Sequence, residues 1–439
     1  MKNFPGFEAQ EVLKRAANIY ATTTVHSKFV PSATHRAHGA WIYDADGNQF
    51  LDFCSGVGVS NCGYGNRHIE GAMIRHIIRT GRLQYIHHDF HNPESVTLAE
   101  ALSAELDRAV GRNNNYKIFL CNSGTEANEA GLKLALAARP ERKKIMAAVN
   151  GFHGRTLGSL SLMTKTAHIR DYPRSFKVFN FPFPRLGDQE NIKGFYRHLE
   201  YMEQHRWADE YNSCVLEMVQ GEGGIYQADP QALKDLQDFC QQHWVLLHID
   251  EVQTGFGRTG KMFAIEHYPF LNPAIVTFAK SIANGYPVGA VAFARWLDWP
   301  EHGRHSNTFG GNALGAVAAL ATMDFIKNKN LAGRAAELGE ILNGGLEYLA
   351  AKFKSRVANV RGLGLMRAID FLDYGGQLSS KFRDEVVEEA YHHGLILIGA
   401  GEAAIRLMPP LVIKKDELTQ GLVRLERAIG IVLRDEINL

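Results

Sequence analysis

The middle of the chain alternates between continuous apolar runs and segments with the apolar spacing of amphipathic helices. In chain order the pattern predicts a strand at 117–123, a helix at 125–138, strands at 143–149 and 213–219, a helix at 230–243 and an apolar run that ends at Asp250. Continuous apolar runs separated by helices are typical of parallel strands that are buried on both faces. The pattern therefore predicts an α/β domain built on a mostly parallel sheet.

The two ends of the chain show a different pattern. Before the alternating region we expect a helix at 8–20, a hairpin around the Asp-Gly pair of 39–53, and helices at 67–80 and 93–109. After Ala313 a long helical region is followed by apolar segments at 360–371, 394–399 and 405–413, with one helix among them and another at the end. This α+β pattern predicts a second, smaller domain, and the boundary is expected within a continuous helix near 315–330.

Two ionisable residues stand at the ends of predicted buried strands. Asp250 ends the run WVLLHID, and Lys280 closes the run IVTFAK within the stretch from Trp244 to Gly289. Ligands of parallel sheets bind beyond the carboxyl ends of the strands, and a buried acid or amine costs free energy unless a function uses it. A desolvated lysine has a lowered pKa and attacks aldehydes, and a carboxylate keeps a ring nitrogen protonated. We therefore predict that Asp250 and Lys280 hold a pyridoxal phosphate ring from opposite sides, the alternatives being a turn cap and a surface lysine.

Composition narrows the class of protein without identifying a function. The chain has 439 residues, 45% hydrophobic and 22% charged, which is ordinary for a globular enzyme. Lys and Arg number 48 and Asp and Glu 47, so nucleic acid and anionic membranes are not expected partners. No apolar run reaches the roughly 18 residues of a membrane span, and the N-terminus lacks the apolar core of a signal peptide. With five scattered cysteines, these features predict a cytoplasmic location.

The segment NSGTEANEA (122–130) joins a predicted strand to a predicted helix. Gly124 lets the backbone approach a ligand, and Thr125 offers a hydroxyl group. Free N–H groups at a helix N-terminus attract a phosphate. The alternative is an ordinary helix cap by Ser or Thr.

Two other motifs suggest chemistry that the surrounding sequence does not support. GFGRTG (255–260) matches the dinucleotide fingerprint, but four residues separate it from the strand and KMFAIEHY is a poor crossover helix. HHDFH (87–91) contains metal-ligand residue types, but no second cluster completes a site, so we expect a polar loop and no metal. The loops 81–92 and 172–190 are polar and irregular, and the pattern predicts no structure for them.

Four further residues have types that suit a cofactor or an acidic substrate. Phe152, in GFHGRT, either belongs to the core or stacks on a flat cofactor. Arg155 and Arg406 suit a dicarboxylate, because a guanidinium group binds a carboxylate through two hydrogen bonds. Glu222 lies in VQGEGG. Taken singly, Arg155, Arg406 and Glu222 are explained as well by ordinary surface charge.

Together, nine segments resemble the class III, or ω-amino-acid, aminotransferases. In family order they are YDADGNQFLDF, NSGTEANEA, FHGRT, VQGEGG, IDEVQTGFGRTG, TFAKSIANG, NTFGGN, VRGLG and IRLMPPL. The resemblance covers nearly the whole chain and is strongest to the 4-aminobutyrate aminotransferases, through VQGEGGIY, TFAKSIANG and VRGLG.

The resemblance implies the type I pyridoxal-phosphate fold. This fold has a large domain, with a mostly parallel sheet flanked by helices, and a smaller α+β domain made from both termini. The expected boundaries are 1–55 for the N-terminal part of the small domain, 56–320 for the large cofactor-binding domain and 321–439 for the C-terminal small domain.

The resemblance also assigns the catalytic groups. Lys280 would form the Schiff base with the cofactor and then move the proton between the substrate carbon and the cofactor. Asp250 would pair with the pyridinium nitrogen, which makes the ring an electron sink. Gln253 would contact the phenolic oxygen of the ring.

The remaining cofactor contacts come from other segments. Phe152 would stack on the ring face, with His153 beside it. Gly124 and Thr125 would bind the phosphate, and Thr308 would reach the same phosphate from the neighbouring subunit. A homodimer, or a dimer of dimers, would then be the active form.

For the substrates, the resemblance implies two carboxylate sites and one movable counter-charge. Arg155 would bind the distal carboxylate of 4-aminobutyrate or 2-oxoglutarate, and Arg406 the α-carboxylate of glutamate. Glu222 would neutralise Arg406 when an ω-amine donor is bound, because an unpaired buried arginine is costly.

Two positions bear on how closely the chain follows the family. Glu217 is followed by Met218 where the family usually has proline, which should change the local backbone and leave the chemistry unchanged. Val57 stands where ornithine enzymes tend to have tyrosine, which favours a 4-aminobutyrate-type donor.

The sequence leaves alternative functions open. An amino-acid racemase or epimerase of the same fold would use the same lysine, although it would not need Arg155 and Glu222. A decarboxylase of this fold and an ornithine, lysine or diamine transaminase are further alternatives. A nicotinamide-dependent oxidoreductase built on GFGRTG belongs to a different class.

Overall fold

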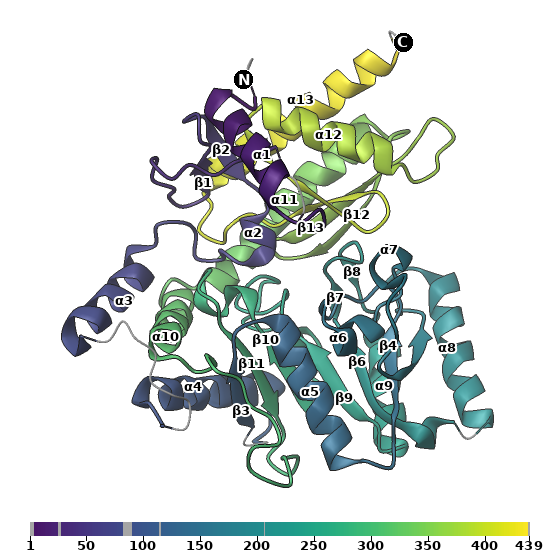
Figure 1. Cartoon of the computed structure of the whole chain (residues 1–439). Coiled ribbons are helices and arrows are strands. Elements are labelled where there is room, and N and C mark those ends of the chain that lie inside the picture. The colour runs from purple at the N-terminus through teal and green to yellow at the C-terminus, as the bar shows by residue number, and fades with distance from the viewer. Residues whose placement is uncertain (1–3, 25–27, 82–89, 114–115, 206, 438–439) are drawn as a thin grey trace.

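The computed structural model describes residues 4–24, 28–81, 90–113, 116–205 and 207–437, and it has two lobes with both chain termini in the same one (Figure 1). Most of the predicted polar loop 81–92, including His87 and His88, lies outside the described residues. Within the described residues no helix is long and apolar enough to cross a membrane. The same residues contain no group of three or more His, Cys, Asp or Glu side chains placed to hold a metal ion.

The large lobe contains a seven-stranded sheet in the order β3-β11-β10-β9-β6-β4-β5. Its strands are β3 (Lys117–Cys121), β4 (Lys144–Ala148), β5 (Lys177–Phe181), β6 (Tyr211–Leu216), β9 (Leu246–Asp250), β10 (Ile275–Phe278) and β11 (Gly289–Phe293). Neighbours from β10 to β5 pair in parallel, as predicted, whereas β11 runs antiparallel to both β10 and β3. The segment 172–190, for which the pattern predicted no structure, contains the edge strand β5.

Helices surround this sheet. They are α3 (Arg67–Thr80), α4 (Pro93–Val110), α5 (Gly124–Ala138), α6 (Leu157–Ser161), α7 (Thr166–Ile169), α8 (Gln189–Gln204), α9 (Pro230–Gln242) and α10 (Ala313–Asn328), with short 3-10 turns η1 (Ala208–Glu210), η2 (Ala264–His267) and η3 (Lys280–Ala283). Some of them pack on the two faces of the sheet, and others, such as α3, pack on neighbouring helices (Figure 1). Alternate residues of β10 face opposite layers: Ile275 packs with Leu134 of α5, and Val276 packs in the larger core on the other side. Burial on both faces explains why these strands are mostly apolar.

The small lobe combines the two ends of the chain. Its sheets are β1-β2-β14 and β12-β13-β16-β15, from strands β1 (Trp41–Tyr43), β2 (Gln49–Asp52), β12 (Val357–Leu363), β13 (Met366–Phe371), β14 (Leu395–Ile396), β15 (Ile398–Ala400) and β16 (Ala404–Leu407). Its helices are α1 (Phe7–Ile19), α2 (Ser55–Gly58), α11 (Leu331–Lys352), α12 (Ser380–His392) and α13 (Lys415–Ile437). β14 pairs in parallel with β2, so both termini build one sheet, as the resemblance implied.

α10 runs without a break across the predicted boundary at 320/321. The boundaries 55/56 and 320/321 themselves stay a prediction.

The GFGRTG motif joins the two lobes. Arg258 is fully buried, and its Nη1 donates to the carbonyl oxygens of Leu365 (2.8 Å) and Pro409 (2.6 Å), while its Nη2 donates to Asn61 Oδ1 (2.6 Å). Burial lowers the pKa of Arg258 to about 9. The motif is followed by a four-residue 3-10 turn, so it lacks the helix that the dinucleotide fingerprint requires.

Candidate active site

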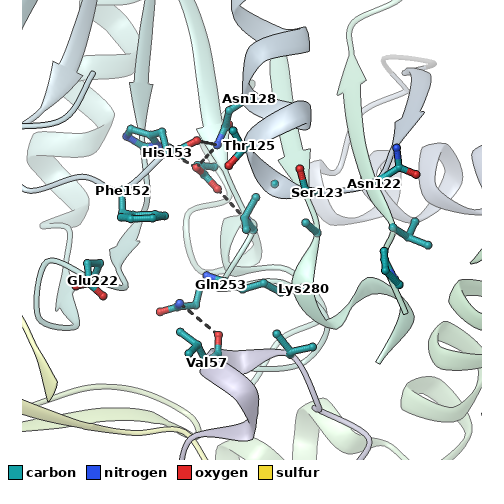
Figure 2. Close-up of a pocket in the computed structure, with 18 of the residues that line it drawn as sticks. Val57, Asn122, Ser123, Thr125, Asn128, Phe152, His153, Glu222, Gln253 and Lys280 are labelled. Carbon is teal, nitrogen blue, oxygen red and sulfur yellow. Dashed lines mark hydrogen bonds and ion pairs between the residues drawn. The ribbon is translucent and has the colours of Figure 1, made fainter. Parts of the chain in front are cut away.

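A cavity of about 430 Å³ lies beyond the carboxyl ends of the parallel strands, where the two lobes meet. Most of the predicted site residues line it, namely Val57, Gly124, Thr125, Phe152, His153, Glu222, Asp250, Gln253, Lys280 and Arg406 (Figure 2). They come from segments that follow β3, β4, β6, β9 and β10 and from two segments of the small lobe. The topology thus brings together side chains that are far apart in sequence.

Asp250 is the centre of a buried hydrogen-bonded cluster. Its Oδ2 lies 2.8 Å from His153 Nδ1 and accepts a hydrogen bond from Asn128 Nδ2 (2.8 Å), while its Oδ1 accepts from Val252 N (2.9 Å). Burial would raise the pKa of Asp250, but these hydrogen bonds and the charge of His153 outweigh it and lower the pKa. Burial likewise opposes the charged form of His153, but Asp250 raises its pKa. Asp250 is therefore a fixed buried anion.

Lys280 begins the short turn η3 directly after β10 and lines the cavity. Burial, and then the positive charge of Arg406, lower its pKa to about 8, against the opposing charges of Glu217, Asp250 and Glu222. Its backbone φ of +48° is unusual for a residue with a side chain. Its amine is therefore far more often unprotonated near neutral pH than that of a surface lysine.

The start of α5 forms another wall of the cavity. Ser123 caps the helix by accepting a hydrogen bond from Glu126 N (3.2 Å), and the following Gly124 packs so closely that a Cβ there would lie 2.7 Å from Val252 Cγ1. A Cβ on Gly154 would similarly lie 2.8 Å from Thr125 Oγ1. The glycines keep this end open, so that the first N–H groups of α5 and the Thr125 hydroxyl are available to an anion.

Glu217 connects two loops of the site. Its Oε1 accepts a hydrogen bond from Phe152 N (3.0 Å), and its Oε2 accepts one from Gly221 N (2.8 Å). Burial, and then repulsion from Asp250, raise its pKa to about 7. The carboxylate thereby fixes both Phe152, whose ring lies beside the cavity in Figure 2, and the glycine-rich turn that carries Glu222.

Gln253 and Val57 close the side of the cavity toward the small lobe. Gln253 Nε2 lies 3.5 Å from Val57 O, and Gln253 Oε1 is buried without a hydrogen-bond partner among the described residues. Val57 has a φ of +67°, which a β-branched residue rarely adopts. A buried amide group with an unused hydrogen-bonding atom, held beside a strained backbone, is typical of a ligand site.

Arg406 and Glu222 form an ion pair at the cavity. Arg406 Nη2 lies 3.1 Å from Glu222 Oε2, and the Arg406 side chain is only 4% exposed. Arg406 Nε and Nη1 are buried without hydrogen-bond partners among the described residues. The guanidinium group therefore has unused N–H donors that could form hydrogen bonds to a carboxylate.

Arg155 and Thr308 are described by the structure but do not line the cavity. Arg155 is exposed; its Nη2 lies 3.1 Å from His168 Nε2, and its guanidinium carbon lies 5.5 Å from the ring centre of Phe152. It is thus a neighbour of the site through Phe152. Thr308 is exposed on the loop that precedes α10.

The residues present fit pyridoxal phosphate. The cavity offers a buried anion for a ring nitrogen (Asp250), a desolvated amine for the aldehyde (Lys280), an amide with an unused atom for a ring oxygen (Gln253) and an open helix start for the phosphate (Gly124 and Thr125). Asp250 and Gln253 are buried, and burial lowers the pKa of Lys280. One ligand bound in the cavity would account for these unfavourable burials and for the open start of α5.

Among the cavity residues that the sequence analysis did not predict, Asn128 and Glu217 make the hydrogen bonds that hold the site together. Asn128 donates to both Asp250 and the His153 carbonyl oxygen (2.9 Å), and its own Oδ1 accepts from Thr277 Oγ1 (2.8 Å). Its position three residues after Thr125 places it on the same face of the predicted helix, and this spacing could have identified it. Glu217 carries no such signal, because its partners are backbone N–H groups.

Comparison with known proteins gives one consistent result. The sequence profile described as Aminotransferase class-III matches residues 22–429. The chain is 35% identical over 403 residues to an acetylornithine aminotransferase of Lactococcus lactis subsp. lactis (strain IL1403), covering 91% of this chain and 97% of that protein. It is 34% identical over 404 residues to an acetylornithine aminotransferase of Bacillus subtilis (strain 168), covering 90% and 94%.

The structure agrees with the sequence comparison. A crystal structure of a Bacillus anthracis aminotransferase superposes with a TM-score of 0.85 at 27% identity and covers 96% of this chain and 98% of that one. The predicted fold and cofactor are confirmed at this level. The chain belongs to the class III aminotransferases, which are pyridoxal-phosphate-dependent transaminases.

Proposed function

We propose that the chain moves the ω-amino group of an amino-acid donor to 2-oxoglutarate. The observation that carries this proposal is the Glu222–Arg406 pair, in which a buried guanidinium group that could bind an α-carboxylate is neutralised by a partly exposed glutamate. A donor without a carboxylate at the reacting carbon leaves the pair intact. Glutamate, formed from 2-oxoglutarate, would replace Glu222 with its own α-carboxylate.

The energetic reason is that Arg406 cannot remain unpaired. Removing one partner of a buried pair costs about 3–5 kcal/mol, because the other charge is left without compensation. Glu222 supplies that compensation, and its side chain, 31% exposed, can leave toward solvent. The same site can then accept both classes of substrate in the two halves of the reaction.

The cofactor-binding roles follow from the geometry of the cavity. When bound, pyridoxal phosphate supplies an electron sink that stabilises negative charge on the substrate carbon. Asp250 would keep the ring nitrogen protonated, Phe152 would stack on the ring, and the start of α5 would bind the phosphate. Lys280 Nζ, with its lowered pKa, would take the proton from the substrate carbon and return it.

The donor is proposed from the relatives and from the site. The relatives are named acetylornithine aminotransferases, which points to the terminal amine of an ornithine-type donor. Val57 lines the cavity and is smaller than the tyrosine that ornithine enzymes tend to have there, which keeps 4-aminobutyrate as a second candidate. Both donors carry the reacting amine far from a carboxylate, and Arg155, which lies beside Phe152, is the residue that we propose to bind that distal group.

The experiment that tests the proposal is a panel of amino donors with 2-oxoglutarate, with glutamate formation as the readout. We expect glutamate from N-acetylornithine, ornithine or 4-aminobutyrate. Racemisation of an amino acid without glutamate formation would instead support a racemase of the same fold.

The substitution Glu222→Gln should slow the two half-reactions to different extents. We expect kcat/KM for the ω-amine donor to fall by about 10²-fold, because Arg406 then faces a ligand that cannot neutralise it. The glutamate half-reaction should fall by less than about threefold, because the α-carboxylate replaces the missing charge. Single-turnover absorbance changes of the bound cofactor measure both, and equal losses would contradict the role of Glu222.

We also propose that the active form is a dimer. Thr308 is exposed and does not line the cavity of its own chain, and the adjacent Phe309 is 60% exposed. A second copy that covers this loop would bury Phe309 and could bring Thr308 to the phosphate end of the partner's site.

A further inference from the structure

Glu222 lies between two cations, one for each carboxylate oxygen. Its Oε2 is 3.1 Å from Arg406 Nη2, and its Oε1 is 3.7 Å from Lys165 Nζ. The two cations differ in environment, because the Arg406 side chain is 4% exposed and that of Lys165 is 48% exposed. Lys165 was not among the residues that the sequence indicated.

A second cavity, of about 270 Å³, opens on the Lys165 side. Glu222 lines this cavity as well as the cofactor cavity, and Lys165, His168 and Tyr226 are among its other lining residues. The glutamate side chain therefore has space on both sides. In Figure 2 it stands at the edge of the cofactor cavity, beyond Phe152.

The backbone of Glu222 is held in place on both sides. Its carbonyl oxygen accepts a hydrogen bond from Gly401 N (2.8 Å) in the small lobe, and the preceding Gly221 N donates to Glu217 Oε2 (2.8 Å). A movement of the carboxylate away from Arg406 would thus be a rotation of the side chain, and Lys165 Nζ already lies 3.7 Å from its other oxygen, Oε1.

We propose that Lys165 is a positioning residue that holds Glu222 away from Arg406 while Arg406 binds the α-carboxylate of glutamate. The inference rests on the proposed function, in which Glu222 leaves Arg406 in one half-reaction. A carboxylate that gives up its partner in a confined space needs another cation, and Lys165 is already within 3.7 Å. The lysine ammonium, on a flexible stem, can follow the carboxylate by a small displacement.

The substitution Lys165→Gln tests this role. We expect KM for glutamate to rise by about fivefold, the scale of a partly exposed ion pair, with a smaller change for the ω-amine donor. Lys165→Arg should restore the wild-type value because it keeps the charge. Lys234→Gln is the matched control, since Lys234 is also 48% exposed and pairs with Asp238 (2.6 Å) far from the site on α9.

A double-mutant cycle with Glu222→Gln identifies the partner of Lys165. If Lys165 acts through Glu222, Lys165→Gln should have no further effect in the Glu222→Gln background. An equal rise in KM for glutamate and for the ω-amine donor would overturn the proposal, because it would mean that Lys165 binds a carboxylate common to both substrates. If Glu222→Gln affects the two half-reactions differently and Lys165→Gln affects them equally, only the role of Lys165 is wrong. If Glu222→Gln affects both half-reactions equally, the proposed function itself is wrong.

Discussion

Turnover should fall by about 10⁴-fold in Lys280→Ala, together with loss of the visible absorption band of covalently attached cofactor. Lys280 lines the cavity and is partly buried, and burial, with the charge of Arg406, lowers its pKa to about 8, so its amine is prepared to react with an aldehyde. No other lysine lines the cofactor cavity within the described residues. Removing the amine therefore removes both the covalent attachment and the group that moves the substrate proton. Glutamate formation and the absorption spectrum measure the two effects.

Two controls separate this role from a general loss of structure. Lys261→Ala removes an exposed lysine near the joint between the lobes and should leave turnover and spectrum unchanged. A small primary amine added to Lys280→Ala should restore part of the turnover, because the missing group is a base of the same chemical type. Full activity of Lys280→Ala would contradict the assignment of the whole cofactor site.

The sequence predicts the central part of this fold because burial leaves a strong pattern. Strands such as β9 and β10 are covered on both faces, so most of their residues are apolar, and the charged Asp250 at the end of β9 then stands out. The antiparallel direction of β11 leaves no such pattern, because a buried strand is apolar whichever way it runs. β5 was missed because it lies at the edge of the sheet and is only partly buried.

Burial also determines which parts of the site the sequence predicts. A charge at the end of an apolar run is conspicuous, whereas Glu217 becomes important only when the fold brings the N–H groups of Phe152 and Gly221 to it. Lys165 is likewise an ordinary lysine until the turn that carries Glu222 lies beside it. Partners that are formed by tertiary contacts between distant loops leave no local spacing to detect.

The carboxylates of the site differ in charge state because their partners differ. Asp250 accepts hydrogen bonds from Asn128 and Val252 and pairs with His153, so its pKa is lowered in spite of burial. Glu217 is buried and is repelled by Asp250, and its hydrogen bonds from backbone N–H groups do not offset these two effects, so its pKa rises to about 7. One ionised and one partly protonated carboxyl group in the same site is the arrangement expected when only the first must carry charge.

Asp250→Asn is therefore expected to lower kcat by about 10³-fold while the chain stays folded. The asparagine side chain has the same shape but no charge, so it cannot keep a ring nitrogen protonated, and the electron sink is lost. Steady-state glutamate formation measures the loss. Glu217→Gln is the matched control, because it also neutralises a buried carboxyl group of the cavity; its kcat should fall by less than about tenfold.

A second readout of Asp250→Asn tests the electrostatic reason directly. Burial favours the neutral imidazole of His153, whereas the hydrogen bond and charge of Asp250, and to a smaller extent the charge of Glu217, raise its pKa. Once the charge is removed, burial dominates and the pKa of His153 should fall below its usual value, which NMR titration of the imidazole detects. Glu217→Gln should lower it much less, since Glu217 makes the smaller contribution. A fall in kcat with an unchanged His153 pKa would mean that Asp250 acts through packing, and the proposed role of its charge would be wrong.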